Sequence, residues 1–102
     1  MKTIFYQDFL QQITGEQDLE NSLDWLIPEF LALKIQVLQV QKNAFEQKYQ
    51  MSFEQYETLV LGGAEHDWED EKMVWEWQKT LILLDAYLKR KEQWEQMSSK
   101  NP

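Results

Sequence analysis

The sequence contains no cysteine, one histidine, three glycines and two prolines among its 102 residues. Without cysteine there is no disulfide, no thiolate nucleophile and no metal site built on sulfur. The few glycines and prolines leave long stretches with no helix breaker. These absences favour a helical chain and exclude the common thiol chemistries.

Long apolar runs are missing as well. The run Leu81–Leu84 is a fragment of the about 20 residues needed to cross a bilayer. The first residues become polar too soon for the apolar region of a signal peptide. We therefore expect a cytoplasmic protein with no contact to a membrane.

The composition describes a folded acidic domain. Hydrophobic residues make up 43% and aromatic residues 14% of the chain, too many for a disordered acidic tail. The 18 acidic and 10 basic side chains give a net charge of −8. This charge repels phosphate backbones, so we expect no direct nucleic-acid binding, and it suits a basic protein partner.

Apolar residues at helical spacing predict two short helices near the N-terminus. Phe5, Phe9 and Ile13 define one face of a helix over residues 4–13, and residues 18–27 repeat the pattern. The next residue is Pro28, which is favoured in the first turn of a new helix. We expect it to separate the second short helix from a long one over residues 29–49.

Two further helices are predicted by their boundary signals. Ser52 followed by Gln55 is a capping-box pattern that begins a short helix, and Gly62–Gly63 ends it. The last helix is expected over residues 69–97.

These elements predict an all-α fold, a small helical bundle built on two long antiparallel helices. Residues 1–102 form a single domain. Within it, residues 1–28 are accessory helices, residues 29–97 are the main helical hairpin with a short middle helix, and residues 98–102 are a frayed tail.

The first long helix carries two apolar stripes instead of one, about 140° apart. The first stripe consists of Phe30, Leu33, Val37, Val40 and Ala44, and the second of Leu31, Ile35, Leu38, Phe45 and Tyr49. On the last helix, Trp75, Ile82 and Ala86 lie nearly opposite a wide apolar face. Either the short helices cover these stripes, or one stripe buries a partner or a second copy.

The segment Glu65–Glu71 combines five carboxylates with His66 and Trp68. A metal site on His66, Asp67 and Asp70 is conceivable, but it lacks a second histidine, and its spacing matches neither an EF-hand loop nor a His-x-x-Glu-His site. Nucleophile elbows and phosphate loops are absent, so we expect neither an enzyme nor a cofactor. Acidic residues here also favour the start of a helix, and Trp68 among them offers an aromatic anchor for a basic surface.

Residues 29–90 resemble small helical antitoxin-like proteins that are paired with TumE-type or other ribonuclease toxins in prokaryotes. The resemblance rests on a long helix, the segment Lys48-Tyr49-Gln50-Met51-Ser52-Phe53-Glu54, the acidic Asp67-Trp68-Glu69 and the tryptophan-rich last helix with Trp75-Glu76-Trp77. It implies a neutraliser that occludes a basic, RNA-cleaving toxin.

We expect the partner to contact residues of the acidic segment and of the long helices. These residues are Glu65, Asp67, Trp68, Glu69, Asp70, Glu71, Trp75, Leu31, Ile35, Leu38 and Phe45. The alternative is a self-associating scaffold protein, since most soluble oligomers are homo-oligomers. A dimeric antitoxin would satisfy both hypotheses.

Overall fold

The structure, a computed structural model, describes residues 2–16, 18–63 and 67–99. Its four helices are α1 (Lys2–Thr14), α2 (Leu19–Tyr49), α3 (Phe53–Gly62) and α4 (Trp68–Ser99). No strand occurs in these three described ranges, so the all-α prediction is confirmed. Of the predicted tail, two residues belong to α4 and the other three lie outside the described residues.

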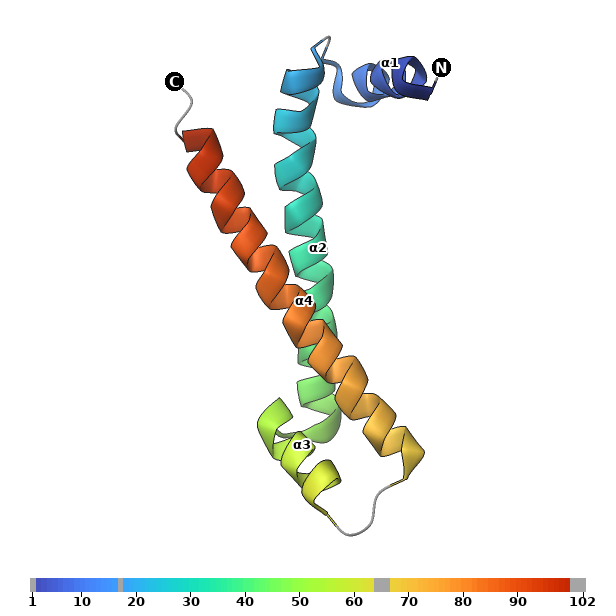
Figure 1. Cartoon of the computed structure of the whole chain (residues 1–102), viewed down its shortest axis with the longest axis vertical. Coiled ribbons are helices and arrows are strands. Elements are labelled where there is room, and N and C mark those ends of the chain that lie inside the picture. The colour runs from blue at the N-terminus through green and yellow to red at the C-terminus, as the bar shows by residue number, and fades with distance from the viewer. Residues whose placement is uncertain (1, 17, 64–66, 100–102) are drawn as a thin grey trace.

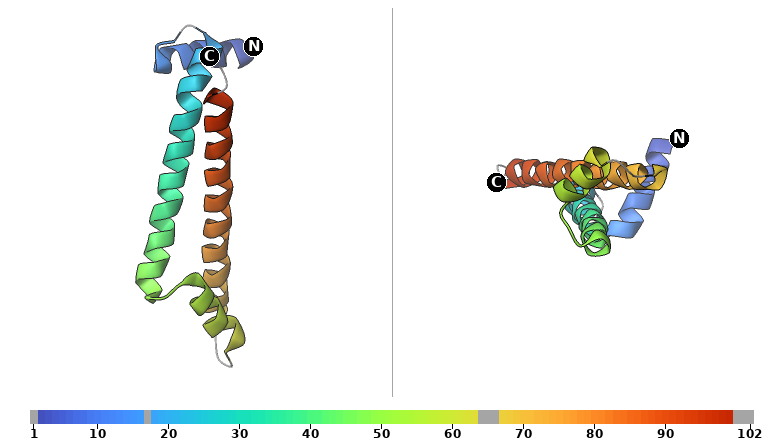
Figure 2. Two further views of the ribbon diagram at one scale, coloured as in Figure 1. Left: turned by 90° about the vertical axis from the view of Figure 1, so that its left-hand side faces the viewer. Right: turned by 90° about the horizontal axis from the view of Figure 1, so that it is seen from below.

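The two long helices run in opposite directions, contact one another and cross (Figure 1). Helix α3 packs against α4 at one end, and α1 lies across the N-terminal end of α2 (Figure 2). The molecule is elongated, with extents of 60 × 33 × 20 Å and a radius of gyration of 19.6 Å. A compact domain of this length has a radius of gyration of about 13 Å. The chain therefore leaves much of its helical surface uncovered.

Helix α2 continues through Pro28, which corrects the predicted break at this residue. A proline inside a helix removes one hydrogen bond and crowds a carbonyl, at a cost of about 3 kcal/mol. The turns before it are held by other contacts. Asp18 caps the helix by accepting the Glu20 N–H at 3.1 Å. Ser22 is buried, and its hydroxyl lies 3.1 Å from that of Thr14 in α1.

The predicted boundaries of α3 are confirmed. The Ser52 hydroxyl accepts the Gln55 N–H at 3.2 Å, and the Gln55 side chain accepts the Ser52 N–H at 3.0 Å. This reciprocal pair satisfies two backbone donors that the first turn leaves unpaired. At the other end, a Cβ on Gly63 would collide with the carbonyl oxygen of Leu59. Only glycine fits at this position, where the backbone changes from helical to extended (φ −85°, ψ 154°).

Trp77 is the centre of the main core. Its side chain is 0% exposed and contacts aromatic rings from α2 and α3. The ring centroids lie 5.4 Å (Phe45), 5.5 Å (Phe53), 5.7 Å (Tyr56) and 5.9 Å (Tyr49) from that of Trp77. Val60 and Val74 complete the buried cluster. One indole on α4 therefore joins the ends of three helices.

A second, aliphatic cluster holds α2 and α4 together where they cross. Ile35, Leu38 and Leu84 are buried there, and Leu83 and Tyr87 pack against them. Nearer the N-terminus of α2, Leu31 is also buried. The second of the two predicted stripes on α2 thus faces α4.

We expect the Trp77→Ala substitution to lower the free energy of unfolding by about 3–5 kcal/mol, because it leaves a cavity where five rings meet. Urea unfolding at one fixed protein concentration measures the change. Trp25, which is 51% exposed, supplies the matched control. Trp25→Ala should cost about 1 kcal/mol or less, and equal losses in the two variants would contradict the central position of Trp77.

The Ser52→Ala substitution should lower the free energy of unfolding by about 1 kcal/mol, because it removes one hydrogen bond of the capping box. Glu54→Ala, in the same turn, removes no bond of the box and serves as the control. Thermal unfolding of both variants measures the difference. No loss for Ser52→Ala would mean that α3 is held by its packing alone.

Candidate functional site

Two of the carboxylates at the start of α4 form hydrogen bonds with the backbone of its first turn. Asp67 caps the helix, because its side chain accepts the Asp70 N–H at 3.0 Å. The Asp70 carboxylate lies 3.5 Å from the Asp67 N–H in the reciprocal contact. Glu69 is exposed and Glu71 is half-buried in the same turn. Two of the four described carboxylates therefore serve the helix, where negative charge complements its dipole. Glu65 and His66 lie outside the described residues.

Two tryptophans stand exposed beside these carboxylates. Trp68 is 60% and Trp75 is 61% exposed, and their rings meet edge to face with centroids 5.9 Å apart. Ile82, which lies seven residues after Trp75 and so on the same side of α4, is 61% exposed. Helical spacing places Lys72 and Lys79 on the same side of α4. This surface is therefore aromatic, with carboxylates at one end and two lysines along it.

The structure corrects the expectation that the second stripe of α2 meets a partner. Leu31, Ile35 and Leu38 are 7%, 8% and 3% exposed and pack toward α4. Phe45 stacks on Trp77 within the main core. All four side chains are thus occupied inside the chain. The first stripe is the exposed one instead, with Phe30, Leu33, Val37 and Val40 between 50% and 62% exposed.

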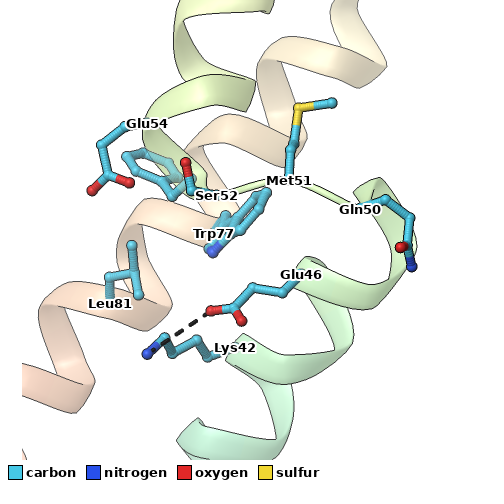
Figure 3. A pocket seen from close by; sticks show the side chains of 9 residues that line it. Lys42, Glu46, Gln50, Met51, Ser52, Glu54, Trp77 and Leu81 are labelled. Atoms are coloured by element: carbon cyan, nitrogen blue, oxygen red, sulfur yellow. Dashed lines mark ion pairs between the residues drawn. The ribbon is translucent and has the colours of Figure 1, made fainter.

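An open hollow of about 580 Å³ lies where the end of α2, the α2–α3 turn and α4 meet (Figure 3). Its walls include the Lys42–Glu46 ion pair, in which nitrogen and oxygen are 3.8 Å apart, and its floor is Trp77. The other lining residues are Gln50, Met51, Ser52, Phe53, Glu54 and Leu81. The Ser52 hydroxyl is engaged in the capping box, where it accepts the Gln55 N–H.

Two buried polar atoms in the main core have no hydrogen-bond partner among the described residues, the Trp77 Nε1 and the Tyr56 hydroxyl. Figure 3 shows the Trp77 nitrogen on the side of the hollow lined by Leu81 and Glu46. Burial raises the pKa of the Tyr56 phenol above its usual value, and the neighbouring Tyr49 and the Asp70 carboxylate raise it further. Tyr56 therefore stays neutral at alkaline pH.

In the part of the chain that is described, no three histidine or carboxylate side chains converge in a way that would hold a metal ion. Neither of the long helices, nor any other described helix, has the length and apolarity that a membrane span requires.

Sequence reasoning missed one feature of α2 because it divided the helix at Pro28. Leu19, Leu23 and Leu26 were assigned to a separate short helix, but the structure places them on the same helix as the first stripe. They continue the stripe toward the N-terminus with unchanged spacing. The spacing of three and four residues continues across Pro28, so the sequence itself indicates one stripe, but the rule that proline begins a new helix led to two separate helices being predicted.

Comparisons of the chain with protein-family models, with curated proteins and with solved structures gave no match. The resemblance of residues 29–90 to antitoxin-like proteins therefore stays a prediction.

The raised pKa of Tyr56 predicts a loss of stability at high pH. In the unfolded chain the phenol ionises near its ordinary value of about 10, whereas the folded chain keeps its proton. The folded state then binds more protons, so the free energy of unfolding falls as the pH rises above about 10. Tyr56→Phe should make this fall shallower in urea unfolding between neutral and alkaline pH. Equal slopes in the two proteins would contradict the assignment.

Proposed function

We propose that the chain is a non-enzymatic protein–protein interaction module of the cytoplasm. It neutralises a basic protein, such as a ribonuclease toxin, by covering the surface that binds the substrate. The contact surface is the start of α4, where Trp68 and Trp75 lie beside Glu69 and Glu71. The crossing of α2 and α4 serves as the rigid support that presents this surface.

The exposed tryptophan pair is the observation that carries the proposal. Two indoles, each about three-fifths exposed, leave a large apolar area in water on one short stretch of helix. Tryptophan is enriched among the residues that dominate binding energies, because one rigid side chain buries a large area. The edge-to-face contact between Trp68 and Trp75 orients both rings before a partner arrives.

The charge of the chain supports a basic partner. The net charge of −8 attracts a positively charged protein from a distance, and the carboxylates at the start of α4 concentrate negative charge beside the tryptophans. Complementary charge of this kind mainly raises the association rate and selects among partners. A surface that binds RNA is itself basic, so an acidic protein competes for it directly. The resemblance to antitoxin-like proteins points in the same direction.

The double substitution Trp68→Ala and Trp75→Ala should abolish capture of a basic protein when the tagged chain is purified from its native host. Mass spectrometry of the co-purified proteins, at low and at high salt, provides the measurement. In wild-type samples we expect one protein of positive net charge, retained at low salt and lost as the salt concentration rises.

The matched control is the double substitution Leu59→Ala and Leu61→Ala on α3. These two residues are 61% and 52% exposed and belong to α3, not to α4. This variant should capture the same protein as wild type. Recovery of the chain alone from wild-type samples, or equal capture by both double variants, would refute the proposal.

A further inference from the structure

Helix α2 carries an apolar stripe whose successive residues are separated alternately by four and three positions. We call it the α2 stripe; it consists of Leu19, Leu23, Leu26, Phe30, Leu33, Val37, Val40 and Ala44. This alternation is the heptad pattern of a two-stranded coiled coil, and it extends without interruption over more than three heptads. It runs the length of α2 on one side of the helix.

The α2 stripe is exposed in the chain by itself. Phe30, Leu33, Val37 and Val40 are 57%, 60%, 50% and 62% exposed. Helix α4 packs against a different side of α2, the side that bears Ile35 and Leu38. Within the chain the stripe is covered only in part, since Leu26 is half-buried and the Phe30 ring meets the Tyr87 ring of α4 edge to face with centroids 6.2 Å apart. The other members leave an exposed surface that a second helix can reach.

We propose that a second copy of this chain covers the α2 stripe, with the two α2 helices paired as a coiled coil. The proposal is independent of the proposed function, because the α2 stripe and the tryptophan pair lie on different helices.

The charges along the C-terminal part of the α2 stripe, from Phe30 to Ala44, favour a second copy over a basic partner, whereas Glu20, Asp24 and Glu29 lie along its N-terminal part. Between Phe30 and Phe45 the only charged residues are Lys34 and Lys42. Lys34 Nζ lies 5.9 Å from the centre of the Tyr87 ring, and Lys42 pairs with Glu46 of its own chain. A basic protein finds no carboxylate along this segment, whereas two copies of an acidic chain meet here without opposing carboxylates.

The residues that flank the stripe agree with this pairing. Gln36, Gln41 and Asn43 occupy the positions beside the apolar seam, where neutral amides tolerate an identical neighbour. In a parallel pair, Glu29 of one copy also lies across the seam from Lys34 of the other, which places opposite charges together.

The length of the stripe is sufficient for a stable pair. From Leu19 to Ala44 it spans about 38 Å at a rise of about 1.5 Å per residue. Only a partner helix of similar length and identical spacing buries all of its members, and a second α2 provides both. The elongated shape of the single chain, with its radius of gyration of 19.6 Å, leaves room for this neighbour.

Sedimentation equilibrium of the full chain tests the proposal. At concentrations from about 1 to 100 μM, wild type should show twice the 12.4 kDa of one chain. Leu33→Glu places a carboxylate in the seam and should raise the dissociation constant at least about 100-fold. Gln39→Glu adds the same charge to an exposed position of α2 outside the stripe and should leave the mass unchanged. A wild-type mass of one chain, or equal behaviour of the two variants, overturns the proposal.

Cysteine cross-linking keeps the test valid if Leu33→Glu unfolds the chain. The natural chain has no cysteine, so any disulfide formed on oxidation comes from the introduced residues. Leu33→Cys should cross-link with itself in a parallel pair, and with Phe30→Cys in a mixed sample if the pair is antiparallel. Gln39→Cys is the control and should not cross-link. Absence of a disulfide in both Leu33→Cys samples overturns the proposal.

Discussion

The packing of the Trp77 indole is the contact on which the rest of the structure depends. Helix α3 is short, and in the turn that leads into it Met51 packs against the same core. Its position is set by the contacts of Phe53 and Tyr56 with Trp77, which also stacks on Phe45 and Tyr49 of α2. The same side chain therefore fixes α3 and the ends of both long helices, and only the aliphatic cluster at the crossing adds to it.

The local features of the fold were predictable from the sequence. The capping box of α3, the stop at Gly63 and the periodicity of the long helices depend on residues within a few positions of one another. The exposed tryptophans at the start of α4 were also identified as candidates, since a Trp among carboxylates is recognisable in the sequence itself. Each of these signals is short-range, so one chain segment is enough to reveal it.

The features that depend on tertiary contacts were not predictable in the same way. The helix rule for proline predicted a break at Pro28, but the Asp18 cap and the buried Ser22 hold the preceding turns in helical form. Which stripe of α2 faces inward could not be read from apolarity, because both stripes are apolar. The stripe that faces inward is determined by packing against α4, where Leu84 contacts Ile35 and Leu38. Leu31, Ile35, Leu38 and Phe45, which are predicted to contact a partner, are instead covered within the chain.

The separation of the two exposed surfaces follows from the way in which the core is built. Because Trp77 gathers the aromatic residues at one end, the other halves of α2 and α4 diverge and share few buried side chains (Figure 1). The remaining exposed apolar residues lie in two lines. The line on α2 has few charges from Phe30 to Ala44, and the line on α4 is aromatic, with carboxylates at one end and Lys72 and Lys79 along it. On the two proposals, charge would distinguish the partners, since a seam with few charges suits an identical helix and an aromatic surface with carboxylates at one end suits a basic protein. One chain of this size would then pair with its own copy through α2 and keep the start of α4 free for a different partner.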